Sequence, residues 1–178
     1  MDRNTRIILV TGGARSGKTA IAERLACHYG GPGRPVYIAT AQPWDAEMAA
    51  RIATHRQDRG SGWDTHEAPR DLPAALAATD RPGGPARLID CLTLWMTNHL
   101  PEPPDLPGLL AALQHQQAPV ILVSNELGQG IVPDNALARR FRDDHGRMNQ
   151  RVAAIADQVW LAVAGQPLQV KPTKGEFP

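Results

Sequence analysis

The sequence predicts an α/β fold in which a mostly parallel sheet carries helices on both faces. Short apolar runs that end at glycine or at a polar residue have the length and composition of buried parallel strands. They alternate with longer segments whose apolar residues recur every three or four positions, as on one face of a helix. Such alternation is typical of parallel sheets joined by crossover helices. A glycine-rich loop between the first strand and the first helix agrees with this fold class.

The expected strands are residues 7–10, 35–40, 63–67, 87–90, 119–124 and 159–164. The expected helices are residues 18–29, 45–59, 71–78, 91–100, 109–116 and 135–157. Residues 80–85, 101–108 and 125–133 are rich in turn-forming residues and predict loops. Neither an internal repeat nor a long linker divides the chain, so residues 1–178 predict a single nucleotide-binding catalytic domain, with residues 172–178 as a tail.

Composition narrows the class of protein. Hydrophobic residues make up 42% and charged residues 21%, which is globular rather than disordered. The formal net charge of +1 gives no general attraction to nucleic acid or to anionic membranes, so neither is an expected partner. Cys27 and Cys91 stand in apolar stretches without a CxxC pairing, which predicts buried free thiols. The apolar run at residues 7–10 is too short for a signal or a membrane span, so we expect a cytoplasmic protein.

The strongest local motif is a P-loop, formed by Gly12, Gly13, Ala14, Arg15, Ser16, Gly17, Lys18 and Thr19. It lies between a strand and a helix, so backbone N–H groups and the helix N-terminus can surround phosphate oxygens. Lys18 is expected to reach the terminal phosphates and Thr19 to bind Mg²⁺, with Arg15 as a second cation. Asp90, at the end of an apolar strand, is either a second acid for Mg²⁺ or a simple strand-end or cap residue. The motif predicts a P-loop NTPase-type (RecA-like) fold.

Further motifs follow the P-loop in order. They are YIATA at residues 37–41, EMAARI at 47–52, HR at 55–56, DCLTLW at 90–95, VSNE at 123–126, GIVP at 130–133 and FRD at 141–143. This series closely resembles the bifunctional adenosylcobinamide kinase / adenosylcobinamide-phosphate guanylyltransferase family of cobalamin synthesis. The resemblance extends from about residue 7 to residue 171.

The resemblance implies two reactions. ATP or GTP phosphorylates adenosylcobinamide, and GMP is then transferred from GTP to adenosylcobinamide phosphate, which gives adenosylcobinamide-GDP and pyrophosphate. In the family a histidine carries the GMP covalently, and its position falls on His55. The family's nucleotide contacts fall on the P-loop and on Ala39, Thr40, Ala41, Arg56, Gln57, Asp58, Arg59, Glu67 and Asp90. The resemblance also implies a homotrimer.

The residues themselves leave several roles open. His55 shares a helix face with Met48 and Ile52, so without the resemblance it would be read as a core histidine. A neutral imidazole is nevertheless a competent nucleophile towards phosphorus. Some family members carry a second histidine just before the nucleophile, where this chain has Thr54, and this favours His55 as the reactive residue.

Other polar and aromatic residues also carry alternatives. Trp63 and Trp95 would either wall a pocket or pack in the core, while Phe141 and His145 are expected in the core. A second polar group would form a network near the site or a subunit interface; it consists of Arg139, Arg142, Asp143 and Asn149. Asn125 and Glu126 end a strand where open α/β sheets bind ligands.

Two other functions remain possible from the residues alone. One is a monofunctional P-loop kinase for another small alcohol, which would use the same loop and Asp90 while His55 is structural. The other is a nucleotide-dependent binding module that hydrolyses its nucleotide slowly. Covalent attachment of GMP to the protein would separate the bifunctional enzyme from both.

Overall fold

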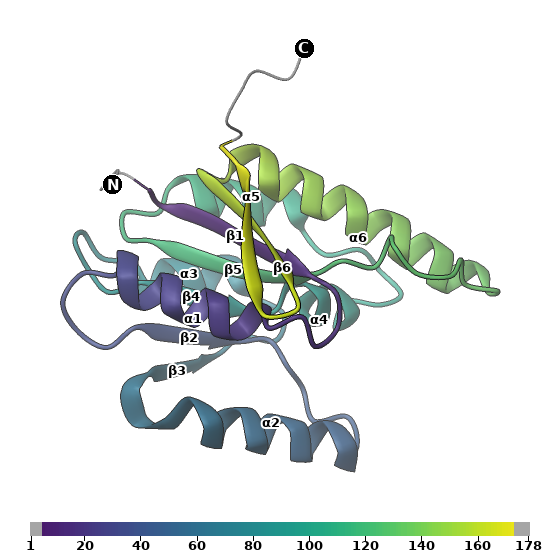
Figure 1. Ribbon diagram of the computed structural model, residues 1–178, viewed down its shortest axis with the longest axis horizontal. Helices are drawn as coiled ribbons and strands as arrows, with labels where there is room; N and C mark the ends of the chain where they lie inside the picture. Colours follow the sequence, from purple (N-terminus) through teal and green to yellow (C-terminus); the bar gives the residue numbers. More distant parts are fainter. Residues whose placement is uncertain (1–4, 173–178) are drawn as a thin grey trace.

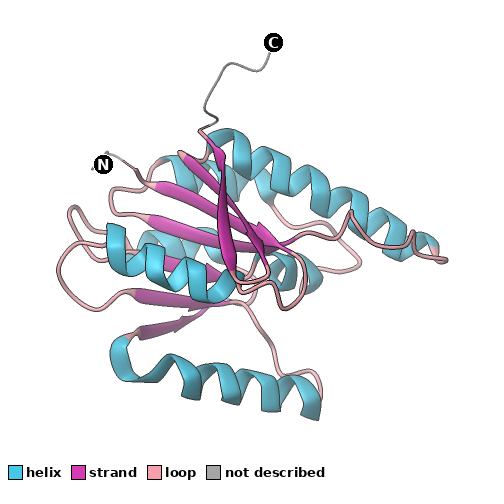
Figure 2. Ribbon diagram, viewed as in Figure 1, coloured by secondary structure: helices cyan, strands magenta, loops and turns pink. Residues whose placement is uncertain are grey.

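A computed structural model describes residues 5–172 and shows a seven-stranded sheet with helices packed around it (Figures 1 and 2). The strands are β1 (Ile7–Gly12), β2 (Val36–Ala39), β3 (Asp64–Glu67), β4 (Arg87–Asp90), β5 (Val120–Asn125), β6 (Gln158–Val163) and β7 (Gln166–Lys171). Their order is β3-β2-β4-β5-β1-β6-β7. All neighbours are parallel except β6 and β7, which form an antiparallel hairpin. The prediction of a mostly parallel sheet is therefore confirmed.

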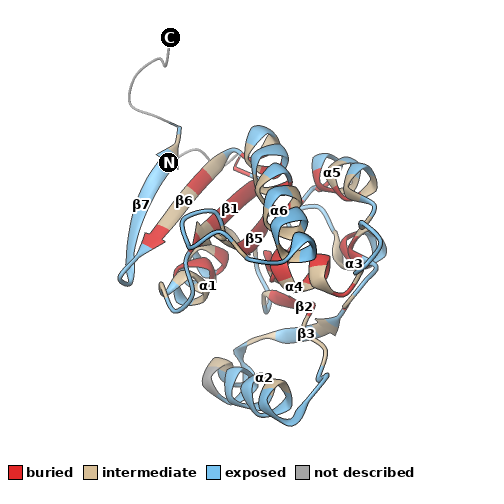
Figure 3. Cartoon of the chain, turned by 90° about the vertical axis from the view of Figure 1, so that its right-hand side faces the viewer, coloured by how far each residue is buried: buried red, intermediate tan, exposed pale blue. Residues whose placement is uncertain are grey.

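Helices cover both faces of this sheet, as expected. The helices are α1 (Lys18–Tyr29), α2 (Ala46–Arg59), α3 (Leu72–Thr79), α4 (Leu92–Thr97), α5 (Leu106–Gln114) and α6 (Ala136–Ile155), with a short 3-10 turn at Gly60–Gly62. In Figure 3, α1 lies on one side of the sheet and α3 to α6 lie on the other. All of the central strands are thereby buried.

The alternation of side chains along the strands divides the core into two layers. In β1, Ile7 and Leu9 face the layer that contains α3 to α6, whereas Ile8 and Val10 face the layer that contains α1. This explains why the central strands read as continuous apolar runs: both of their faces are buried. Because both faces of the central strands are covered, only the ends of these strands can contribute residues to a binding site.

The prediction missed β7 and displaced two helix boundaries. β7 is exposed along most of its length and contains Pro167, so it lacks the apolar signal of the other strands. Helix α5 begins at Leu106, inside the expected loop 101–108, because the Asp105 carboxylate caps it by accepting the Gly108 amide. Helix α4 ends at Thr97 rather than at residue 100. The predicted tail lies outside the described residues except for Pro172.

Helix α2 packs on neither face of the sheet. It lies beyond the edge strand β3, away from the helices that cover the two faces (Figures 1 and 3). Its N-terminus is capped by the Asp45 carboxylate, which accepts the Met48 amide at 2.7 Å. Only Met48 and Ile52 supply large apolar side chains, so the helix has too little apolar surface to be buried against the sheet.

The two cysteines have different environments. Cys91 is buried, as expected, but Cys27 is exposed, which corrects the prediction for that residue. Cys27 lies on α1, whose buried stripe consists of Ile21, Ala22 and Ala26. The apolar residues around each cysteine in the sequence did not show whether the thiol would face the core or the solvent.

Within residues 5–172, none of the helices combines the length and the hydrophobicity that a membrane crossing requires.

Candidate active site

The P-loop follows β1 and is supported by the turn between β6 and β7. The Gly165 amide donates to the Ser16 carbonyl at 2.9 Å. Gly17 has a φ of 88°, and a Cβ there would lie 2.9 Å from the Gly165 Cα, so both backbone strain and space demand glycine. Arg15 also has a positive φ and is exposed. The loop thus holds the curled conformation that a phosphate cradle requires.

Lys18 and Thr19 open α1 and lie at the mouth of this loop. The Lys18 ammonium donates to the Gly13 carbonyl at 3.0 Å, which keeps the side chain folded over the loop. Burial lowers the pKa of Lys18, and the neighbouring Cys91 and Asp90 oppose that shift. The cation therefore lies within electrostatic reach of the acid at the end of β4.

A cleft of about 180 Å³ runs between the P-loop, the carboxyl ends of β2, β4 and β5, and α2. Nine of the predicted site residues line it: Lys18, Thr19, Ala39, Ala41, His55, Arg56, Arg59, Glu67 and Asp90. The P-loop residues Gly12, Gly13, Ala14, Arg15, Ser16 and Gly17 lie next to the cleft rather than in its lining. The cleft occupies the edge of the sheet where open α/β folds bind ligands.

Two further predicted residues, Thr40 and Gln57, do not contribute a side chain to the cleft. Thr40 is fully buried, and its hydroxyl is occupied by the backbone of Cys91: it donates to the carbonyl at 2.8 Å and accepts the amide at 2.7 Å. Gln57 is exposed on α2 outside the lining. Asp58 belongs to α2, but its side chain lies outside what the structure describes. Thr40 therefore shapes the cleft only by holding the strand ends together.

Asp90 ends β4 and receives a hydrogen bond from Tyr37 on β2. The Tyr37 hydroxyl donates to Asp90 Oδ2 at 2.5 Å. Burial and the neighbouring carboxylate raise the pKa of Tyr37 far above its usual value, so the phenol stays protonated and remains a donor. This contact orients Asp90 towards the cleft and leaves its second carboxylate oxygen available to another ligand.

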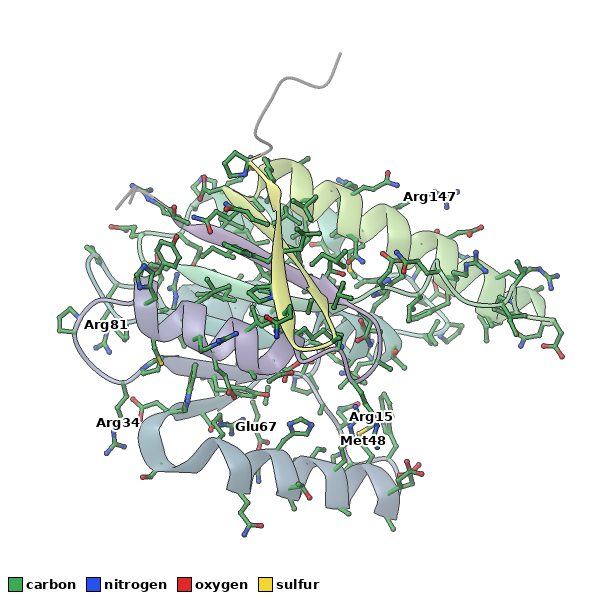
Figure 4. The ribbon with its side chains drawn as sticks, in the orientation of Figure 1. Arg15, Arg34, Met48, Glu67, Arg81 and Arg147 are labelled. Atoms are coloured by element: carbon green, nitrogen blue, oxygen red, sulfur yellow. The ribbon has the colours of Figure 1, made fainter. Side chains whose placement is uncertain are left out.

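Two arginines of α2 join the helix to the edge of the sheet. Arg56 forms an ion pair with Glu67 on β3. The Arg59 guanidinium stacks 3.6 Å from the centre of the Tyr37 ring and donates to Thr65 at 3.1 Å. Figure 4 shows Glu67 extending from β3 towards α2. These contacts close one end of the cleft. The guanidinium groups of Arg56 and Arg59 both belong to its lining.

His55 lies on the side of α2 that faces the cleft, and its side chain is exposed. Met48 and Ile52 share that side and are only partly buried. The interpretation of His55 as a core histidine is therefore wrong: its apolar neighbours line the cleft rather than a packed interior. The imidazole is therefore exposed at the wall of the cleft.

Sequence reasoning gave no ligand role to several residues that line the cleft: Tyr37, Met48, Arg51, Ile52, Cys91 and Leu94. For the α2 residues a signal was present, because Met48, Arg51 and Ile52 fall on the same helical side as His55. Tyr37 belongs to an expected strand, and nothing in the sequence indicated that its side chain reaches the cleft. Its role becomes visible only in the structure, where its hydroxyl donates to Asp90. Asn125 also lines the cleft, in agreement with its expected place at the end of β5.

The Asn125 backbone is clamped by a buried polar network. Its amide donates to the Thr93 hydroxyl at 3.0 Å, and its carbonyl accepts from Asn149 at 2.9 Å. His145 is 1% exposed and contacts Thr93 and Ser124 through Nε2. Burial lowers the pKa of His145 to about 4, with Glu126 opposing the shift, so this imidazole is neutral at pH 7. The expected core position of His145 is confirmed, and its hydrogen bonds help to fix the end of β5.

The remaining expectations for aromatic and polar residues have clear outcomes. Trp95 is buried and donates to the Arg70 carbonyl, and Trp63 packs edge-on against Tyr37 with 5.9 Å between the ring centres, so neither lines the cleft. Arg139 donates to the carbonyls of residues 133 and 134. Beside the end of β5 lies an open hollow of about 600 Å³, here called the polar basin, whose polar side chains are Glu126, Arg142, Asp143, His145, Arg147, Asn149 and Gln150.

Mg²⁺ is a hard cation that prefers oxygen ligands and enters such sites together with a nucleotide. Thr19 and Asp90 supply a hydroxyl and a carboxylate to the same cleft. No cluster of three or more His, Cys, Asp or Glu side chains suited to a metal occurs within the described residues. This donor set fits an ion held jointly by the protein and by phosphate oxygens rather than a resident metal.

Comparisons with known proteins agree with this site. Residues 8–170 match the family model described as cobinamide kinase / cobinamide phosphate guanyltransferase. The chain is 45% identical over 184 residues to the bifunctional adenosylcobalamin biosynthesis protein CobU of Salmonella typhimurium, covering 93% of this chain and 99% of that protein. It is also 45% identical over 174 residues to the corresponding protein CobP of Pseudomonas aeruginosa, covering 94% and 97%.

Among solved structures, an ATPase from the type III secretion system of pathogenic bacteria aligns with a TM-score of 0.51 and 12% identity, covering 92% of this chain and 56% of that one. At this identity the likeness shows the fold alone, and the predicted P-loop NTPase-type fold is confirmed. The match to the family model spans nearly all of the described residues and includes every strand and helix that forms the cleft. The chain belongs to the cobinamide kinase / cobinamide phosphate guanyltransferase family.

Proposed function

We propose that this cleft serves both reactions of the family, with His55 as the residue that carries GMP. The family assigns the chain the activities of an adenosylcobinamide kinase and an adenosylcobinamide-phosphate guanylyltransferase in cobalamin biosynthesis. The single observation that carries the proposal is the position of His55, which faces the P-loop cleft from α2 in an exposed and unpacked environment.

In the kinase reaction, the hydroxyl oxygen of adenosylcobinamide attacks the γ-phosphorus of ATP or GTP. A new P–O bond forms, the bond to the β-phosphate oxygen breaks, and the hydroxyl proton is released. Lys18 and the P-loop amides would stabilise the charge on the transferring and departing phosphates. Mg²⁺, held by Thr19 and Asp90, would neutralise further negative charge on these phosphates.

In the guanylyl transfer, a ring nitrogen of His55 attacks the α-phosphorus of GTP, and pyrophosphate leaves. A phosphate oxygen of adenosylcobinamide phosphate then attacks the same phosphorus, so that the P–N bond breaks and His55 is regenerated. The P-loop would hold the departing pyrophosphate in this reaction, and Arg56 and Arg59 would lie beside the phosphorus. One cradle thereby serves attack at either end of a triphosphate.

Other nucleophiles of the cleft are less suited to this attack. Burial raises the pKa of the Cys91 thiol to about 11, so it is protonated at pH 7. The pKa of the Tyr37 phenol is raised as well, and its proton is donated to Asp90. Lys18 is required as a cation on the phosphates. Among the described side chains of the cleft, His55 combines exposure with an imidazole nitrogen, a group that can attack phosphorus.

The test is incubation of the protein with GTP labelled at the α-phosphorus, followed by measurement of acid-labile label on the protein. The wild type should retain label, and His55→Ala should retain none while still phosphorylating adenosylcobinamide. Thr54→Ala is a matched control, because this exposed residue lies next to His55 on the same helix outside the cleft lining and should leave the label unchanged.

A label that survives in His55→Ala would show that another residue carries GMP. A wild type that transfers γ-phosphate without ever becoming labelled would support the monofunctional kinase instead.

The proposal extends to three features that accompany the family resemblance: Mg²⁺ as the metal, a cytoplasmic location, and assembly as a homotrimer. Sedimentation equilibrium of the full chain tests the trimer directly.

A further inference from the structure

The polar basin lies directly beside the nucleotide cleft and shares a wall with it. Asn125 lines the cleft, and the next residue, Glu126, lines the basin. Asn149 also lines the basin, and it donates to the Asn125 carbonyl at 2.9 Å. The Glu126 amide donates to the Gly12 carbonyl at 2.9 Å, so this wall is joined to the P-loop strand. A molecule seated in the basin needs to cross only this strand end to reach the nucleotide.

The lining of the basin is polar throughout. Two carboxylates, two guanidiniums, two carboxamides and the imidazole of His145 surround it, and aliphatic side chains are absent from its described lining. Arg142 donates through Nη2 to the Gly128 carbonyl at 3.0 Å, whereas its Nη1 is buried without a hydrogen-bond partner among the described residues. A buried donor without a partner is costly, so this group is a natural contact for a ligand carbonyl.

The balance of charge identifies the class of ligand. A second triphosphate would require a clear excess of cations, and Glu126 and Asp143 oppose it. A neutral molecule that both donates and accepts hydrogen bonds fits better, and primary amides do both. Adenosylcobinamide carries primary amides around the edge of its corrin ring. A hollow of about 600 Å³ can hold one edge of such a ring while the rest stays in solvent.

We infer that the polar basin binds the amide-bearing edge of the corrinoid acceptor, so that the acceptor's hydroxyl or phosphate arm passes Asn125 into the cleft. This inference rests on the proposed function, because it concerns the acceptor of both reactions. Arg142 donates from Nη1 to an amide carbonyl, and Glu126 and Asp143 accept amide N–H groups. The same seat serves both reactions, since only the end of the arm changes between them.

The test is steady-state kinetics of adenosylcobinamide phosphorylation at saturating ATP with two basin variants, Arg142→Met and Asp143→Ala. Arg142→Met should raise the KM for adenosylcobinamide about tenfold, as expected for loss of a hydrogen bond to a charged group. Asp143 is exposed, and no hydrogen bond joins its side chain to the loop around Gly128 within the described residues. Asp143→Ala should therefore raise the KM for adenosylcobinamide several-fold. In both variants the KM for ATP, measured at saturating adenosylcobinamide, should stay at the wild-type value, and so should the GTP-dependent protein label, which forms without an acceptor.

Arg151→Met is the matched control, because Arg151 is exposed on the same helix outside the basin. It should leave both KM values unchanged. An unchanged acceptor KM in Asp143→Ala and Arg142→Met, or an equal rise in the KM for ATP, would overturn the inference. If Arg142→Met does not fold, Gln150→Ala takes its place, since this side chain is also exposed. A wild type that does not phosphorylate adenosylcobinamide would instead overturn the proposed function.

Discussion

At the scale of single residues, the site separates groups that bind phosphate from groups that set its geometry. Lys18 and Thr19 belong to the P-loop motif, and their roles follow from its spacing. Tyr37 and Thr40 act through other residues: the first donates to Asp90, and the second holds the Cys91 backbone. A motif reveals the first kind of residue, whereas only the three-dimensional contacts reveal the second.

Tyr37→Phe should lower kcat for phosphoryl transfer about tenfold, because Asp90 loses the hydrogen bond that orients it. The Kd for ATP, measured by calorimetry, should change little, since the P-loop is untouched. Tyr29→Phe is a suitable control: its hydroxyl accepts from Gln158, away from the cleft lining, and should have no effect on kcat. An unchanged kcat in Tyr37→Phe would show that Asp90 does not depend on this contact.

The two cysteines should react very differently with iodoacetamide. Alkylation requires the thiolate, and burial raises the pKa of Cys91 to about 11, whereas Cys27 is exposed. At pH 8 the folded protein should gain one adduct, located at Cys27 by peptide mass spectrometry. Unfolding in urea should expose Cys91 and give two. Rapid modification of Cys91 in the native protein would contradict its buried position.

At the scale of elements, the sequence predicted buried segments better than exposed ones. The strands from β1 to β6 were all expected, because each central strand is apolar on both faces and the short β3 follows a glycine-rich turn at residues 60–62. β7 was missed because its Leu168 and Val170 point into solvent and give no core signal. The place of α2 was also beyond prediction, since its periodicity shows a preferred side but not what lies opposite.

Helix α2 should exchange its backbone amides much faster than α6 does. It is held to β3 and β2 by an exposed ion pair and a stacked arginine, and exposed ion pairs contribute little stability. Helix α6 buries Met148 and Val152 in the main core and should open only with the whole domain. Hydrogen exchange followed by mass spectrometry tests this, and GTP should slow exchange in α2 selectively. Equal protection of the two helices without nucleotide would contradict the prediction.

At the scale of the whole molecule, the two ends of the sheet have different tasks. The carboxyl ends of the strands form the cleft, and the amino ends are joined by a buried ion pair. The Arg87 side chain is fully buried and pairs with Asp80 at 2.5 Å. It also donates to the Ala118 carbonyl at 2.6 Å, and Asp80 accepts the amides of Gln117 and Ala118. These contacts join the two segments that lead into β4 and β5. They lie at the amino ends of the strands, opposite the carboxyl ends that form the cleft.

Asp80→Ala should destabilise the fold by about 3 kcal/mol, because it leaves the Arg87 charge buried without its partner. Urea unfolding followed by circular dichroism measures this, and Asp64→Ala, which removes an exposed ion pair with Arg34, should change stability by less than about 1 kcal/mol. Nucleotide affinity should be unaffected in both. A loss below about 1 kcal/mol in Asp80→Ala would show that the buried pair contributes little.

The same carboxylate predicts a pH dependence. Burial acts to raise the pKa of Asp80, but the amides of Ala118 and Gln117 and the Arg87 guanidinium together lower it below 3.8. A lowered pKa in the folded state means that the stabilisation is complete above the unfolded-state pKa and is lost as pH falls through the folded one. The free energy of unfolding should therefore decline below about pH 4, and this acid-induced decline should be smaller in Asp80→Ala.

The position of β1 in the middle of the sheet has a consequence for how the chain is made. β1 pairs with β5 and β6, and the P-loop that follows it is supported by the turn at Gly165. A ribosome synthesises β1 and the loop before β5, β6 and the turn at Gly165, which all follow them in the sequence. The nascent chain must therefore carry an apolar strand without its partners until these segments emerge, and exposed strand edges attract chaperones or other chains during that time. Synthesis of β6 and of the turn at Gly165, rather than synthesis of the P-loop, marks the moment at which nucleotide can be held.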